Sequence, residues 1–173
     1  MKKIVPLFLV VSIFLFMPVV VEAQSELDLH VSQYDDSPAY GVSLRLPEID
    51  FWSLGLDVLY QEQNYEDYNF VLQYKYPEQL LPETETYLKA GFGYLEKNNS
   101  IKRGLTTGFL MNKGISENLS GRTEVRIGVF PQDFSLFYRT GFYYDLNDNL
   151  DLSLSYSGFD GYHGLNLGTL IKF

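Results

Sequence analysis

The chain has 173 residues, which is enough for one domain with a sizeable closed structure. It carries 22 acidic and 13 basic residues, a formal net charge of −9, and this acidic balance argues against nucleic acid as a partner. It contains no cysteine, which excludes disulfides and thiolate metal sites, and its aromatic share of 16% exceeds that of an ordinary soluble domain.

Residues 1–23 have the pattern of a secretory signal peptide. Two lysines precede an apolar run from Ile4 to Val21, and the small residue Ala23 follows at a suitable cleavage position. An uncleaved membrane anchor is the alternative, but Pro18 interrupts a helix near the end of the run. The sequence therefore predicts export, removal of 1–23, and a mature domain of residues 24–173.

The mature chain shows period-two alternation of apolar and polar residues, about once every fifteen residues, and no sustained helical periodicity. Each alternating segment has roughly seven to eleven residues, the length at which a tilted strand crosses a bilayer. In chain order the predicted strands are Glu26–Ser32, Ala39–Leu46, Leu54–Tyr60, Tyr68–Tyr76, Thr86–Tyr94, Leu105–Met111, Gly121–Val129, Phe134–Tyr144, Leu150–Tyr156 and Gly164–Phe173. Ten strands are the first expectation, and eight the alternative, because the alternation is weaker in Thr86–Tyr94 and Leu105–Met111.

The connections between these segments are short and polar, with none longer than about ten residues. They read "QYDDSP", "PEID", "EQNYE", "PEQLLPE", "EKNNS", "NKGISEN", "PQD", "NDN" and "SGFDGYH". All five prolines of the mature chain fall in the predicted connections, where no hydrogen bond of a sheet is lost. This placement supports the predicted segments.

The two faces of the predicted strands differ in charge. One row, which we expect to face outward, contains apolar, small or neutral residues and no charged residue within the ten segments. The other row contains His30 and the charged residues Glu26, Asp28, Arg45, Asp57, Lys75, Lys89, Arg122, Glu124, Arg126, Arg139, Asp151 and Lys172. A soluble sandwich also alternates, with its apolar rows inside, so alternation alone does not decide between the two arrangements.

The positions of the aromatic residues favour a membrane. One predicted rim contains Tyr40, Tyr60, Tyr68, Phe92, Tyr94, Phe134 and Tyr156, and the other contains Phe51, Trp52, Tyr74, Tyr76, Phe109, Phe142, Tyr144 and Phe173. Two aromatic girdles around an aliphatic band are typical of transmembrane barrels, because Tyr and Trp prefer the membrane interface. The predicted interface anchors are Tyr40, Trp52, Tyr60, Tyr68, Tyr76, Tyr94, Tyr144, Tyr156 and Phe173.

The last segment, Gly164–Phe173, alternates up to a terminal aromatic residue. In hydrocarbon a sheet has to close on itself, so we expect this segment to pair with the first strand. At this point the sequence resembles small bacterial outer-membrane β-barrel proteins of Gram-negative type. The resemblance implies an all-β, antiparallel, up-and-down transmembrane β-barrel in the outer membrane, and recognition by the barrel-assembly machinery through the strand that ends at Phe173.

Architecture alone does not fix function. The charged inward row suits a lumen filled by ion pairs, and this predicts a structural role. The sharper alternative is a narrow passive channel for small solutes with slight anion preference, because the row contains more basic than acidic residues. A secreted soluble β-barrel that binds an apolar ligand is the main rival to both, and it would bury the apolar rows.

Catalysis is not predicted. One family of small-barrel lipid deacylases has a His and a Ser two residues apart, and His30 and Ser32 share that spacing, which leaves an outer-membrane lipid-modifying enzyme as an alternative. Both residues lie on the row assigned to the lumen, however, and His163 falls in a predicted connection. Two distant histidines and no cysteine give no metal signature, and no cofactor is expected.

Overall fold

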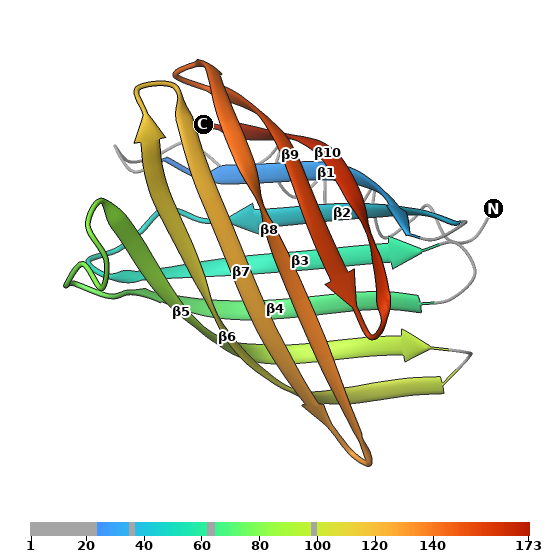
Figure 1. The fold of residues 1–173 in the computed structure, drawn as a ribbon. Coiled ribbons are helices and arrows are strands. Elements are labelled where there is room, and N and C mark those ends of the chain that lie inside the picture. Colours follow the sequence, from blue (N-terminus) through green and yellow to red (C-terminus); the bar gives the residue numbers. More distant parts are fainter. Residues whose placement is uncertain (1–23, 35–36, 62–64, 98–99) are drawn as a thin grey trace.

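The computed structural model describes residues 24–34, 37–61, 65–97 and 100–173, so the predicted signal peptide lies outside the described residues. All the regular structure in these ranges is β-strand (Figure 1). No helix in the described ranges is long and apolar enough to span a membrane.

Ten antiparallel strands form one closed barrel in which each strand pairs with its neighbours along the chain. They are β1 (Glu26–Tyr34), β2 (Ser37–Arg45), β3 (Trp52–Gln61), β4 (Tyr65–Lys75), β5 (Thr84–Lys97), β6 (Ser100–Ser116), β7 (Leu119–Phe130), β8 (Asp133–Asn147), β9 (Leu150–Phe159) and β10 (Tyr162–Lys172). The prediction of an antiparallel, up-and-down barrel with ten strands rather than eight is confirmed.

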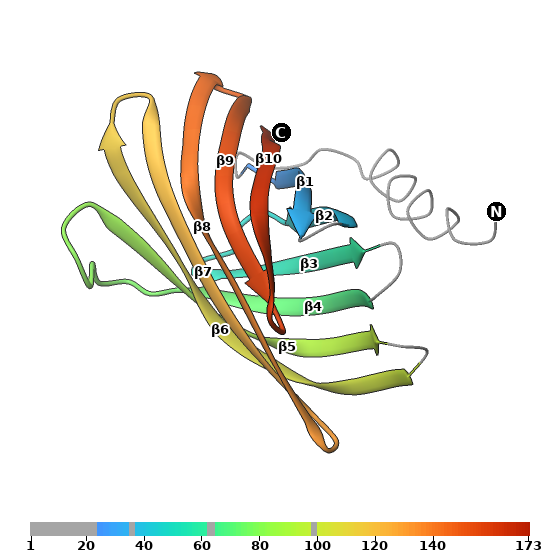
Figure 2. The same cartoon turned by 45° about the vertical axis from the view of Figure 1, so that its right-hand side comes forward.

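Closure occurs between the first and last strands, which lie side by side in Figures 1 and 2. The register runs from Glu26 opposite Lys172 to Tyr34 opposite Gly164. Two further backbone hydrogen bonds join Ser25 and Phe173, with N···O distances of 2.8 and 3.0 Å. The seam is therefore paired up to the last residue, so the barrel has no open edge there.

The start of β1 and the end of β10 lie at the same end of the barrel, which we call the terminal rim. It also carries connections 46–51, 76–83, 117–118 and 148–149. The opposite end, the distal rim, carries the described connections 131–132 and 160–161 and the far ends of the other strands. The described turns 131–132 and 160–161 contain Gln132 and Asp160 at positive φ, as tight two-residue connections require.

The strands are longer than predicted, with 9 to 17 residues instead of seven to eleven. The predicted connection "NKGISEN" lies largely within β6, and "SGFDGYH" shrinks to Asp160–Gly161, so His163 belongs to β10. The apolar stripe marks only the part of a strand that would face hydrocarbon, whereas backbone pairing continues beyond it into the polar rims. Figure 2 shows that β6, β7 and β8 are the long, bent strands of one side.

The two faces of the wall have inverted polarity. Large aliphatic and aromatic side chains are exposed on the outside, among them Leu54, Phe70, Leu105, Leu136, Leu152, Leu154, Leu165 and Leu167. The longer strands place charged residues on the outward row only near the rims, at Glu66, Glu96, Arg103 and Lys113. Charged residues of the inward row, such as Asp28, Glu124 and Arg126, are buried.

Candidate functional site: the lumen

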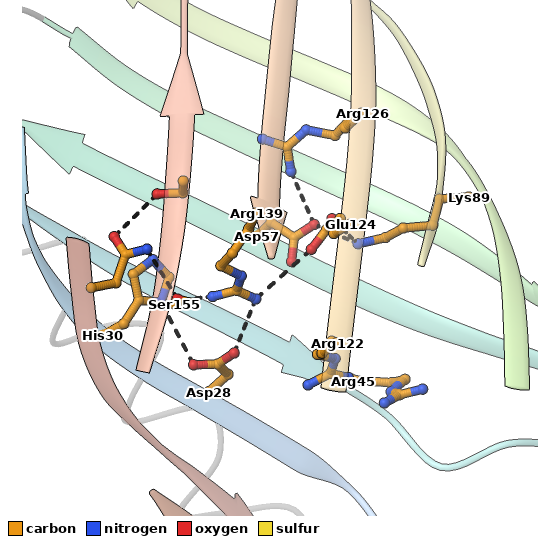
Figure 3. A network of polar contacts seen from close by, with 12 residues as sticks. Asp28, His30, Arg45, Asp57, Lys89, Arg122, Glu124, Arg126, Arg139 and Ser155 are labelled. Carbon is orange, nitrogen blue, oxygen red and sulfur yellow. Dashed lines mark hydrogen bonds and ion pairs between the residues drawn. The ribbon is translucent and has the colours of Figure 1, made fainter. Parts of the chain in front are cut away.

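The centre of the lumen is an ion-pair network that joins opposite walls (Figure 3). Asp57 on β3 accepts hydrogen bonds from Lys89 Nζ on β5 and from Arg126 Nη1 on β7, both at 3.1 Å. Arg126 also donates to Asp67 Oδ2 on β4 at 2.5 Å. Two basic side chains thus neutralise two carboxylates that the inward row of each strand brings to the barrel axis.

Arg139 on β8 links this centre to the first strand. Its Nη2 lies 3.0 Å from Asp28 Oδ2 and 3.8 Å from Glu124 Oε2, and its Nη1 lies 3.0 Å from His30 Nδ1. Glu124 is also 2.5 Å from Lys89 Nζ. Figure 3 shows Arg139 between Asp28 and Glu124, so the contacts form one continuous network from β1 to β8.

A second group of charges lies closer to the terminal rim. Glu26 accepts hydrogen bonds from Arg45, and from Arg122 Nη2 at 3.1 Å. The two guanidinium groups also stack on aromatic rings, Arg45 over Tyr87 at 4.7 Å and Arg122 over Tyr143 at 5.4 Å from the ring centroid. These contacts restrict the motion of the long Arg45 and Arg122 side chains inside the lumen.

Two residues of the predicted lumen set lie at the terminal rim instead of the centre. Lys75 is half-buried and binds Glu85 at 2.6 Å, and Asp151 accepts a hydrogen bond from Lys172 Nζ at 2.8 Å. Both positions are at the terminal end of their strands. Of the predicted inward charged row, the structure therefore brings Glu26, Asp28, Arg45, Asp57, Lys89, Arg122, Glu124, Arg126 and Arg139 together, with His30 beside them, and leaves Lys75, Asp151 and Lys172 outside.

A polar network of uncharged side chains spans the barrel seam. Asn166 on β10 accepts hydrogen bonds from Ser32 on β1 and from Ser157 on β9, and its amide donates to Ser155 Oγ at 3.0 Å. The Tyr34 hydroxyl continues the network to Ser157 Oγ at 2.5 Å. These side chains are buried, so each of these hydrogen bonds takes the place of a hydrogen bond that the group would otherwise make to water.

The distal part of the lumen contains an apolar plug, which sequence reasoning missed. The plug is the buried cluster Tyr34, Ala39, Leu59, Leu95, Phe130, Phe137 and Phe159, with Tyr162 packed against it. All these residues lie on the inward row near the distal ends of their strands. The plug meets the ion-pair network at Phe137, where the guanidinium carbon of Arg126 lies 4.7 Å from the centroid of the Phe137 ring.

Little space remains inside the barrel. Within the described part of the chain, the interior cavities lined by network residues measure about 30 and 10 Å³. A single water molecule needs roughly 10–15 Å³ by the same measure. These two cavities therefore have room for a few water molecules.

The candidate catalytic pair has structural contacts. Ser32 donates its hydroxyl hydrogen bond to Asn166, and the His30 ring contacts Arg139 and lies 3.6 Å from Asp28. Both side chains are buried in the lumen. Within the described ranges, no group of three or more His, Asp or Glu side chains is arranged to hold a metal ion.

Aromatic residues lie near both rims of the outer face. Trp52 and Tyr74 contact each other near the terminal rim with ring centroids 4.7 Å apart, and Tyr68 and Tyr94 do so near the distal rim at 5.8 Å. Tyr40 and Tyr156 are exposed on the distal side, Tyr144 and Phe173 on the terminal side, while Tyr60 and Tyr76 are half-buried. Phe109 differs from expectation, because β6 is long enough to place it at mid-strand, opposite Leu88 and Val125.

No protein-family model matches the sequence, and no curated protein is similar enough to count as a relative. Solved structures do match. The KdgM porin, solved in complex with disordered oligogalacturonate, is 9% identical with a TM-score of 0.53, over 86% of this chain and 99% of that one. The NanC porin is 11% identical with a TM-score of 0.52, over 85% of this chain and 100% of that one. At the level of architecture, the chain has the fold of small outer-membrane β-barrels.

Proposed function

We propose that the mature chain is an integral β-barrel protein of the outer membrane with a structural role and a closed lumen. Residues 1–23 act as the signal peptide, the terminal rim faces the periplasm, and the distal rim faces outward. An even strand number, with both termini at one rim, suits this orientation. The barrel itself is a rigid body whose interior is occupied by its own side chains.

The observation that carries the proposal is the inverted polarity of the wall. Leucines such as Leu154 and Leu167 are exposed over half or more of their surface, while Asp57, Glu124 and Arg126 are less than a tenth exposed. In water this arrangement would expose a broad apolar surface, which monomeric soluble proteins rarely do. In a bilayer the apolar outer face contacts lipid, and the closed sheet provides hydrogen-bond partners for the backbone N–H and C=O groups.

The lumen supports a structural role over transport. In the central and terminal network Arg45, Lys89, Arg122, Arg126 and Arg139 face Glu26, Asp28, Asp57, Asp67 and Glu124, five basic against five acidic residues. This balance gives the described lumen no excess of positive charge with which to attract anions. The apolar plug lies in series with the network and adds a second barrier.

A narrow channel for small solutes is the second candidate. It is favoured by the shared fold with two proteins described as porins, one of them with a bound oligogalacturonate. Such a channel would require the plug and the ion-pair network to move aside together. Single-channel recording of the refolded protein in planar bilayers distinguishes the candidates. The structural role predicts no conductance steps from inserted protein, and resolved steps would establish a channel instead.

We further propose that the barrel-assembly machinery recognises the closing strand. The outward positions of β10 are Leu165, Leu167, Thr169 and Ile171, and the row ends at the exposed Phe173. The strand pairs with β1, and this pairing closes the sheet. A substitution at Phe173, described in the Discussion, tests this partner.

A further inference from the structure

A second hollow lies on the outside of the barrel, on the face of β6 to β10 that the proposed location turns toward lipid. It measures about 670 Å³, within the range of small-molecule binding sites. Its floor and walls come from neighbouring outward rows, with Met111, Thr123, Thr140 and Tyr156 in one row and Gly121, Phe142 and Leu154 in the next. We call this hollow the outer groove.

The floor of the outer groove is low because its residues are small. Gly121 has no side chain, and a Cβ atom placed there would lie 3.4 Å from Ile115 Cδ1 and 4.0 Å from the Lys113 carbonyl oxygen. Thr123 and Thr140 lie beside it and are hydrogen-bonded to each other at 2.9 Å. This bond pairs the two hydroxyl groups, so the floor presents mainly methyl groups to a ligand. Phe142 and Tyr156, both exposed, also line the groove.

One end of the outer groove carries a positive charge. Lys113 lies on the outward row of β6 near the terminal rim, opposite Thr84 and Gly121, and is exposed. Leu81 and Ile115 flank the same end. The other end reaches Leu165 on β10, so the outer groove runs from a cationic rim into the apolar outer face.

We propose that the outer groove binds one glycerophospholipid of the periplasmic leaflet, with an acyl chain over Gly121 and the phosphate at Lys113. This inference rests on the proposed membrane location. An apolar groove with one cation at the level of the headgroups has the charge and polarity pattern of an anionic phospholipid. The lipid fills a hollow that would otherwise leave the wall of β6 to β9 unevenly packed against the bilayer.

The test uses the full mature chain refolded in vesicles of phosphatidylethanolamine and phosphatidylglycerol, then extracted in mild detergent for native mass spectrometry. We expect a single retained phospholipid on the wild-type barrel. Gly121→Leu fills the groove and removes packing contacts with the acyl chain, so retention falls about threefold. Lys113→Gln lowers retention of phosphatidylglycerol about fivefold and leaves that of phosphatidylethanolamine nearly unchanged.

Gly114→Leu is the matched control, because a Cβ at Gly114 meets nothing within 4 Å and the residue does not line the outer groove. Equal lipid retention by wild type, Gly121→Leu and Gly114→Leu would overturn the proposal. Correct insertion of every variant is verified by heat-modifiable gel mobility. Failure of all variants, wild type included, to insert would count against the membrane location itself, which separates the two proposals.

Discussion

Arg126 on β7 reaches across the lumen to Asp57 on β3, with 3.1 Å between Nη1 and Oδ2, although the two strands share no backbone pairing. Both residues are less than a tenth exposed. The pair therefore joins opposite walls of the barrel, and each charge is largely removed from bulk water.

Arg126→Met should destabilise the barrel by about 3–5 kcal/mol, because it leaves the carboxylates of Asp57 and Asp67 buried with fewer partners. Urea unfolding in lipid vesicles, followed by tryptophan fluorescence, measures the change. Lys75→Met is the control: its ion pair with Glu85 is partly exposed at the rim, so a loss below about 1 kcal/mol is expected. Equal losses for the two variants would mean that the central network contributes no more than a surface pair.

Leu154→Arg tests which face meets lipid. Leu154 lies at mid-strand on β9 and is 51% exposed, so a charge there should cost about 2–4 kcal/mol at the bilayer midplane. Leu146 is 49% exposed but lies near the terminal rim, where Leu146→Arg should cost about 0–1 kcal/mol. The same unfolding assay compares them, and a Leu154→Arg protein as stable as wild type would be incompatible with a lipid-facing β9.

The plug and the ionic layer should act as two barriers in series. Phe137→Ala removes the ring on which Arg126 stacks but leaves the ion pairs in place, so this variant should stay silent in planar bilayers. Phe137→Ala combined with Arg126→Ala opens both layers and should give conductance steps. Wild-type steps, or steps from Phe137→Ala alone, would show that the ionic layer does not close the lumen.

The sequence was sufficient to predict the strands and their closure, but not the arrangement across the lumen. Alternation from Glu26 to Phe173 identifies ten strands and, with the neighbouring turns, the pairing of each with the next. Which inward residues meet across the barrel, such as Asp57 and Arg126, depends on strand tilt and shear, which no local pattern carries. The predicted lumen set therefore included Lys75, which lies at the rim, and omitted Asp67, which binds Arg126.

The apolar plug was missed for a related reason. Leu95, Phe130 and Phe159 lie at strand ends, beyond the segments in which alternation was recognised. Each of them continues the inward row of its strand by one or two positions. A search for inward apolar residues gathered at one rim would have found the plug.

The closing strand offers a test of assembly that separates side chain from backbone. Phe173→Ala keeps the two backbone hydrogen bonds to Ser25, whereas deletion of Phe173 removes both. We expect Phe173→Ala to refold in detergent like wild type but to reach the outer membrane poorly in cells. Deletion should also lower stability in vitro by about 1–3 kcal/mol, the contribution of two hydrogen bonds. Normal membrane levels of Phe173→Ala in cells would remove the terminal ring from the recognition signal.

The most direct test of the inverted wall uses the absence of cysteine from the chain, which allows single spin labels to be placed at will. Labels at consecutive positions 152–156 of β9, in protein reconstituted in vesicles, report contact with dissolved oxygen and with a water-soluble nickel complex. The account predicts high oxygen accessibility at Leu152, Leu154 and Tyr156 and protection from both reagents at Ser153 and Ser155. Protection of the three apolar positions, with exposure of the two serines to nickel, would mean that the apolar side faces inward and that the protein is a soluble barrel.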